Sequence, residues 1–201
     1  KAKKAVVVGG GLTGLEVVES LHLQGLDVTY LVREKWYFDR ALNEHEASFI
    51  HDRLKDIGVD LRLEEEIGEF IAQEAEINDK DGNTKKIKKI KGIKTNKGNV
   101  LDCDLAYITI GVGSNIELAK KTNIKTNRGI LVDEYQRTNF KNIFAAGDCA
   151  EIPAASGSTV ELLWYSAREQ GRVAAYNMID LPMKYDSGTY YNCARFLDMD
   201  Y

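Results

Sequence analysis

The chain has 201 residues, of which 44% are hydrophobic and 29% are charged, and its net charge is −4. This composition is ordinary for a folded soluble chain, argues against disorder, and gives no general attraction to nucleic acid or anionic membranes. No apolar run is long enough to cross a bilayer, and three widely spaced cysteines exclude a disulfide framework and a cysteine zinc site. We therefore expect a cytoplasmic α/β protein with no metal centre, no membrane association and no nucleic-acid partner.

The first 112 residues alternate between strand patterns and helix patterns. The predicted strands lie at residues 5–8, 28–32, 59–63 and 105–110, and the predicted helices at 14–24 and 43–57. The continuous apolar runs at 5–8 and 105–110 are typical of buried parallel strands. The second helix carries the apolar residues Phe49, Ile50, Leu54 and Ile57, and Gly58 follows it.

A polar β-meander is predicted between the third and fourth strands. Its turns are expected at residues 81–83 and 97–99. Seven lysines lie between Lys85 and Lys97, which is the charge footprint of a nucleic-acid patch. However, Ile87, Ile90 and Ile93 interrupt them as the inward residues of a strand, and no aromatic platform accompanies them. We therefore interpret the run as a solvated strand.

The pattern after residue 112 is sparser. A short helix is predicted at 116–121, strands at 129–132 and 142–146, and a long helix at 160–179. Two short strands and one long helix are few for an independent core, so this part is expected to be incomplete on its own.

A glycine-rich turn, Gly9-Gly10-Gly11-Leu12-Thr13-Gly14, directly follows the first strand and opens the first helix. In this context a GxGxxG pattern predicts dinucleotide binding. One glycine makes the tight turn, one lets the backbone approach a pyrophosphate, and one lets helix and strand pack closely. The helix N-terminus then offers free N–H groups to the phosphates. A purely structural strand–helix turn is the alternative.

The end of the second strand bears on the choice between NAD and NADP. An acidic residue there would accept a hydrogen bond from the ribose 2′-hydroxyl of NAD, whereas an arginine would favour the 2′-phosphate of NADP. Val32 cannot accept a hydrogen bond, whereas Arg33 and Lys35 could meet a phosphate. Glu34 stands between these two, and all three charges could equally be solvated on a loop. The choice stays open, with a lean toward NADPH.

Three segments carry motifs that occur together in one protein family. Residues 9–16 read GGGLTGLE, residues 103–115 read CDLAYITIGVGSN, and residues 129–148 run from GILVD to NIFAAGD. In this order and spacing they resemble the FAD-dependent pyridine nucleotide-disulfide oxidoreductase family. The nearest branch is the one containing NAD(P)H-dependent rubredoxin, ferredoxin and nitrite reductase-like flavoproteins.

The resemblance implies an α/β fold with three parts. Residues 1–112 would form a Rossmann-like NAD(P)-binding domain with a parallel sheet and a β-meander. Residues 113–181 would form the C-terminal part of a discontinuous FAD-binding domain, and residues 182–201 the start of a further C-terminal region. The family's N-terminal FAD half, with its own glycine motif, is absent from this sequence.

The resemblance also implies cofactor roles for single residues. The glycines of the turn would surround the NAD(P) pyrophosphate, and Glu16 would lie toward the nicotinamide, near the flavin. Gly111 would let the crossover strand approach the cofactor, and Asp148 would accept a hydrogen bond from the ribityl or ribose part of FAD. The candidate cofactor-binding residues are Gly9, Gly10, Gly11, Leu12, Thr13, Gly14, Glu16, Val32, Arg33, Lys35, Gly111, Gly147 and Asp148.

The expected function is transfer of hydride from NAD(P)H to FAD and of electrons to an acceptor protein or small oxidant. A non-catalytic dinucleotide-binding module without its own flavin is the alternative. None of Cys103, Cys149 and Cys193 takes the place of the family's redox cysteines, and the sequence does not name the electron acceptor. We expect a truncated flavoenzyme or a short natural chain that forms a homo-oligomer or pairs with the missing FAD half.

Overall fold

The computed structural model describes residues 1–78, 83–155, 157–188 and 192–201. The chain forms two compact units, which we call unit 1 (residues 1–111 and 193–201) and unit 2 (residues 112–192). Within the described residues, none of the helices combines the length and the apolar character needed to span a membrane.

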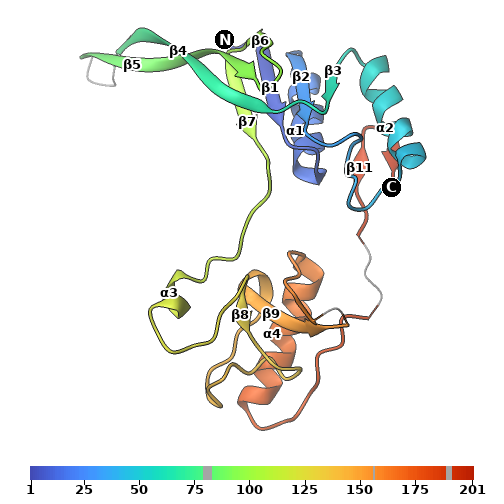
Figure 1. The fold of residues 1–201 in the computed structure, drawn as a ribbon, viewed down its shortest axis with the longest axis vertical. Helices are drawn as coiled ribbons and strands as arrows, with labels where there is room; N and C mark the ends of the chain where they lie inside the picture. Colours follow the sequence, from blue (N-terminus) through green and yellow to red (C-terminus); the bar gives the residue numbers. More distant parts are fainter. Residues whose placement is uncertain (79–82, 156, 189–191) are drawn as a thin grey trace. The chain divides into compact units, whose positions relative to one another are not determined.

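Unit 1 is built on a four-stranded parallel sheet with the strand order β3-β2-β1-β7 (Figure 1). Its strands are β1 (Lys4–Val8), β2 (Asp27–Val32), β3 (Asp60–Leu63) and β7 (Leu105–Ile108). Ala5 and Val7 of β1 belong to one buried cluster, whereas Val6 and Val8 belong to another. Because alternate residues of a strand face opposite sides of the sheet, both faces of β1 are covered, which explains its continuous apolar run.

Two helices connect the first three strands, α1 (Leu12–Leu23) and α2 (Glu44–Asp56). α2 begins at a capping box, in which Asn43 Oδ1 accepts the Glu46 N–H at 3.0 Å and Glu46 Oε2 accepts the Asn43 N–H at 2.8 Å. It packs through Ala47, Ile50 and Leu54. Phe49, which is also apolar, is 59% exposed, because it falls outside this i, i+3, i+7 stripe.

The predicted meander is present as three antiparallel strands, β4 (Ile67–Asn78), β5 (Thr84–Thr95) and β6 (Val100–Asp102). The turn predicted at 97–99 is confirmed, since Gly98 has a φ of 83° and donates its N–H to the Thr95 carbonyl at 2.9 Å. The other predicted turn, at 81–83, lies largely outside the described residues. Of the isoleucines predicted to face inward, Ile93 is buried but Ile87 is exposed.

A buried carboxylate joins the meander to the sheet. Glu65 follows β3 and accepts hydrogen bonds from Thr95 Oγ1 at 2.6 Å and Asn99 Nδ2 at 2.7 Å. Burial alone would raise the pKa of Glu65, but these two bonds, with the charges of Arg62 and Lys97, outweigh it and lower the pKa. The ionised form is therefore the one that the fold stabilises.

The strand predicted at 105–110 is shorter and less buried than expected. β7 ends at Ile108, and the exposed fractions of Tyr107, Ile108 and Ile110 are 40%, 44% and 75%. The reason is its place in the sheet, because β7 pairs only with β1 and its other edge has no neighbouring strand among the described residues.

Unit 1 is completed by a short hairpin formed by residues 194–201, which we call the C-terminal hairpin. It contains β11 (Arg195–Phe196) and β12 (Met199–Asp200) and lies beside α2 in Figure 1. Phe196 is fully buried in the same cluster as Leu15, Tyr30 and Ile50. The sequence patterns did not indicate that this segment packs into the core of unit 1.

Unit 2 contains a three-stranded sheet with the order β10-β9-β8 and one long helix. Its elements are α3 (Glu117–Lys120), β8 (Ile130–Leu131), η1 (Gly147–Cys149), β9 (Ala150–Ala154), β10 (Gly157–Thr159) and α4 (Trp164–Met178). Its apolar cluster is small and is formed by Val132, Ala145, Ala150 and Ile152. Glu151 is fully buried, where it accepts hydrogen bonds from Gly129 N at 2.9 Å and Ser158 Oγ at 2.6 Å.

Two predicted elements of unit 2 differ from the structure. Residues 142–146 form only a single antiparallel bridge, between Arg137 and Phe144, rather than a strand. A strand needs a partner along its length, and here the neighbouring backbone is a loop that pairs only locally. The long helix begins at Trp164 instead of near Val160, since Leu163 is still extended.

Candidate cofactor site

At two positions of the glycine turn between β1 and α1, a side chain would collide with backbone. Gly9 has a φ of 123°, and a Cβ there would lie 2.3 Å from the Thr109 carbonyl oxygen. A Cβ on Gly14 would lie 2.1 Å from the Gly9 carbonyl oxygen. Gly9 therefore permits the turn, and Gly14 permits the close contact between α1 and β1.

Gly11 differs from these two glycines because the space around it is open. It is the N-cap of α1, a Cβ there would meet nothing within 4 Å, and no described side chain caps the helix. The N–H groups of Leu12, Thr13 and Gly14 in the first turn have no intrahelical acceptor. This end of α1 thus offers free backbone N–H groups and the positive end of the helix dipole, which are features that favour an anion.

A buried tyrosine is hydrogen-bonded to the backbone of the glycine turn. The Tyr30 hydroxyl donates to the Gly9 carbonyl at 2.9 Å and lies 3.5 Å from the Gly11 carbonyl. Its side chain is fully buried, and burial raises the pKa of the hydroxyl far above its ordinary value, so it stays a donor. Sequence reasoning missed Tyr30, because a tyrosine in a buried strand reads as ordinary core.

The carboxyl end of β2 lies against the same turn. Val32 is fully buried, and a Cβ on Gly10 would lie 2.6 Å from Val32 Cγ1 and 3.4 Å from Glu34 Oε2. Arg33 points away from the core and pairs with Glu34, with Nη2 and Oε1 2.8 Å apart. Val32 thus packs beneath the turn, whereas the carboxylate beside it belongs to Glu34, which was not among the predicted cofactor residues. Lys35 is exposed.

Two other predicted residues of unit 1 lie at its surface. Glu16 is exposed on the second turn of α1, and its charge adds a smaller effect to burial, which is the main cause of the raised pKa values of Tyr37 and Tyr201. Gly111 is exposed with a φ of 98°, and it is the last residue of unit 1 before the chain enters unit 2. Their contacts with a cofactor remain predictions.

Gly147 and Asp148 lie in unit 2, in the 3₁₀ turn before β9. Gly147 is buried, has a φ of 78°, and donates its N–H to Gln170 Oε1 at 2.8 Å. Gln170 in turn contacts Glu161, which accepts a hydrogen bond from the Tyr185 hydroxyl at 2.5 Å. Asp148 is exposed beside this buried support. The role of Gln170 was not predicted, since a glutamine within a helix gives no pattern signal.

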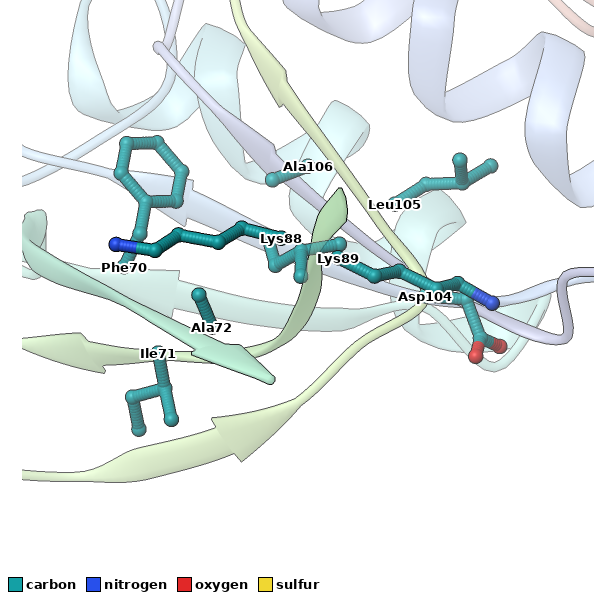
Figure 2. A pocket seen from close by; sticks show the side chains of 9 residues that line it. Phe70, Ile71, Ala72, Lys88, Lys89, Asp104, Leu105 and Ala106 are labelled. Carbon is teal, nitrogen blue, oxygen red and sulfur yellow. The ribbon is translucent and has the colours of Figure 1, made fainter. Parts of the chain in front are cut away.

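A groove in unit 1 lies away from the glycine turn. Figure 2 shows a groove of about 420 Å³ between the base of the β4–β5 ribbon and β7, lined by Phe70, Lys88 and Leu105 among others. Leu105 begins β7 and pairs with Ala5 near the start of β1, whereas the glycine turn follows the end of β1. The groove therefore lies at the amino ends of the strands, and dinucleotides bind at the carboxyl ends of parallel strands.

Comparison with known proteins finds similarity to several reductases. It is 37% identical over 148 residues to rhodocoxin reductase of Rhodococcus erythropolis, covering 74% of this chain and 32% of that protein. It is 28% identical over 182 residues to the nitrite reductase [NAD(P)H] of Bacillus subtilis (strain 168), covering 90% of this chain and 20% of that protein. The chain thus spans a third or less of these two relatives.

The solved structures give the same result for the fold. An FAD-dependent pyridine nucleotide-disulphide oxidoreductase from Desulfovibrio vulgaris matches with a TM-score of 0.83 and 26% identity, covering all of this chain and 48% of that one. The family model for pyridine nucleotide-disulphide oxidoreductases matches residues 1–171. The predicted fold class is confirmed, and this chain belongs to the pyridine nucleotide-disulphide oxidoreductase family.

Proposed function

We propose that the chain holds the pyrophosphate of a nicotinamide dinucleotide at the N-terminus of α1, within an oxidoreductase that passes hydride from NAD(P)H to FAD. The observation that carries the proposal is the open, uncapped N-terminus at Gly11, at a turn whose other glycines are closely packed. The proteins of this family are FAD- and NAD(P)H-dependent oxidoreductases. The glycine turn fits the dinucleotide, because an anion can reach the first-turn N–H groups without meeting a side chain at Gly11.

The carboxylate of Glu34 supports NADH as the preferred dinucleotide. It lies at the carboxyl end of β2 beside Gly10, where an acidic group can accept a hydrogen bond from a ribose 2′-hydroxyl. A 2′-phosphate in the same place would face a like charge. Arg33 supports NADPH less well than its position in the sequence suggested, because its guanidinium is already paired with Glu34.

The FAD would supply the two-electron chemistry when bound. Of the residues in this chain, Asp148 fits a hydroxyl group of its ribityl or ribose part, since its carboxylate is exposed and can accept. The Gln170 bond holds the preceding Gly147 in place. Electrons would then pass to a redox protein or a small oxidant, and the names of the rhodocoxin and nitrite reductase relatives support this electron-transfer role.

Titration of the chain with NADH, followed by nicotinamide fluorescence, tests the dinucleotide site. In Gly11→Asp the new carboxylate occupies the phosphate position, yet aspartate is a favourable N-cap and has room there, so the helix is retained. We expect affinity to fall at least about 100-fold. Gly171→Asp adds the same charge at an open position on α4 and should bind NADH normally. Equal binding by both variants would refute the site.

The flavin part is tested by adding FAD, removing the excess and recording the visible absorption spectrum. A retained flavin band that NADH bleaches supports hydride transfer by this chain. A chain that binds NADH but retains no flavin supports the alternative, a dinucleotide-binding module whose flavin chemistry needs further sequence or a partner.

A further inference from the structure

The C-terminal hairpin contacts the loop that lies against the glycine turn. The Tyr201 hydroxyl is 2.8 Å from the Tyr37 hydroxyl, and the two rings meet edge to face with their centroids 6.5 Å apart. Tyr37 is fully buried and Tyr201 is half-buried, so this contact is partly shielded from water. A hydrogen bond in such surroundings restricts both partners strongly.

The loop on the other side of this contact leads directly to the turn. The Tyr37 N–H donates to His51 Nε2 on α2 at 3.0 Å, and the next residue, Phe38, donates its N–H to the Gly10 carbonyl at 2.9 Å. Phe38 has a φ of 52°, a conformation that costs energy for a non-glycine residue and needs support from its surroundings. Tyr37 is thus one residue from a backbone contact with the phosphate-binding turn.

The hairpin is itself fixed to both helices of unit 1. The Leu197 N–H donates to Glu19 Oε1 on α1 at 2.8 Å, and Arg53 Nε on α2 pairs with Asp198 Oδ1 at 2.9 Å. Phe196, within the hairpin, is fully buried. The Tyr201 hydroxyl is therefore carried by a segment that is anchored to both helices.

We propose that Tyr201 and Tyr37 are positioning residues for dinucleotide binding: their paired hydroxyls hold the 36–38 loop, and through Phe38 the Gly10 carbonyl, in the conformation that leaves the N-terminus of α1 open. This inference rests on the proposed function, since it concerns the same site. The two residues touch the turn only through the loop, so their contribution is to affinity and not to the transfer of hydride.

The test is a double-mutant cycle on NADH binding with Tyr37→Phe and Tyr201→Phe. Each substitution keeps the ring and removes one hydroxyl of the pair, and loss of one hydrogen bond weakens NADH binding by about two- to tenfold. Because both variants break the same bond, the double variant should bind no more weakly than either single one. Additive losses, or unchanged affinity in Tyr201→Phe, would overturn the proposal.

Asp198→Asn is the matched control within the hairpin. This substitution removes the ion pair between Asp198 and Arg53 and leaves both tyrosines in place. Because the Asp198 side chain is 71% exposed, the pair contributes little, and NADH affinity should not change. If Asp198→Asn loses as much NADH affinity as the tyrosine variants, the packing of the whole hairpin matters and not the hydroxyl pair. That result would also overturn the proposal.

Hydrogen exchange at the Phe38 amide separates this inference from the proposed function. Tyr201→Phe should accelerate exchange at that amide severalfold, whereas exchange in the interior of β1 should stay the same. If the unmodified chain fails to bind NADH, the proposed function is wrong, and unchanged Phe38 exchange would then reject the inference independently.

Discussion

The two candidate cofactor segments are held in place by different means. In unit 1 the glycine turn is fixed by backbone packing, with Gly14 directly against the Gly9 carbonyl. In unit 2 the Gly147 turn is fixed by a side chain, since Gln170 accepts the Gly147 N–H. Closely packed backbone tolerates no added atom, whereas a polar support tolerates some added volume but not the loss of its acceptor.

The largest effect is expected for a methyl group added at Gly14. Gly14→Ala places a Cβ 2.1 Å from a backbone oxygen, so we expect the free energy of unfolding of unit 1 to fall by about 3 kcal/mol and NADH binding to be lost. In Gly147→Ala the new Cβ lies 3.4 Å from the Ala167 Cβ, and the positive φ costs only about 1 kcal/mol. Urea unfolding measures the loss of unfolding free energy in both variants. A larger loss in Gly147→Ala than in Gly14→Ala would reverse the comparison.

Removal of the polar support in unit 2 should have the next largest effect. Gln170→Leu leaves the buried Gly147 N–H without its acceptor, which should lower the free energy of unfolding of unit 2 by about 2 kcal/mol. Gln73→Leu, on the exposed part of β4, serves as the control and should be near neutral. The unfolding of unit 1 should be unaffected in both variants. Chemical denaturation followed by NMR signals from each unit gives the free energy of unfolding of both units in each variant.

A smaller effect on specificity is expected at Glu34. Glu34→Gln removes the like charge that a 2′-phosphate would face and frees Arg33, so the affinity ratio of NADPH to NADH should rise about tenfold. Glu117→Gln breaks a comparable surface pair, with Lys120, in unit 2 and should leave the ratio unchanged. Fluorescence titrations with both dinucleotides provide the measurement. An unchanged ratio in Glu34→Gln would remove the argument for NADH.

The smallest effect concerns stability in acid. Here the two units should behave alike, because each is stabilised by a buried, ionised carboxylate. Burial alone would raise the pKa of Glu151, but hydrogen bonds from Ser158, Gly129 and Asn127 lower it, as hydrogen bonds do for Glu65 in unit 1. A carboxylate whose folded pKa lies below its unfolded value stabilises the fold fully above that unfolded value, which is about 4.5. This stabilisation is lost as the pH falls through the lower, folded pKa.

Acid titrations of Glu65→Gln and Glu151→Gln check this point. Each substitution should flatten the loss of stability below about pH 4.5 in its own unit only. A steeper acid transition in either variant would show that the ionised carboxylate is not the stabilising form. Circular dichroism during acidification, combined with unit-specific NMR signals, distinguishes the two units.

Local patterns predicted much of unit 1 because its elements follow short-range rules. The glycine turn, the helix that follows it and the end of that helix near Gly25 each depend on neighbouring residues, and all are present. The bond from Tyr30 to the turn could not be predicted, since it joins positions 21 residues apart in sequence. The strand expected at 142–146 failed for a related reason, as it depends on a partner and not on its own composition.

The return of residues 193–201 to unit 1 has a consequence for how the chain is made. All of unit 2 is synthesised between the two parts of unit 1, so the core around Phe196 closes only after unit 2 has left the ribosome. Until then, the sheet that carries the glycine turn has an unfilled space where Phe196 belongs. Unit 2 thus has its first opportunity to fold before unit 1 can close its core, and a nascent chain should gain affinity for dinucleotide only after residues 193–201 have left the ribosome.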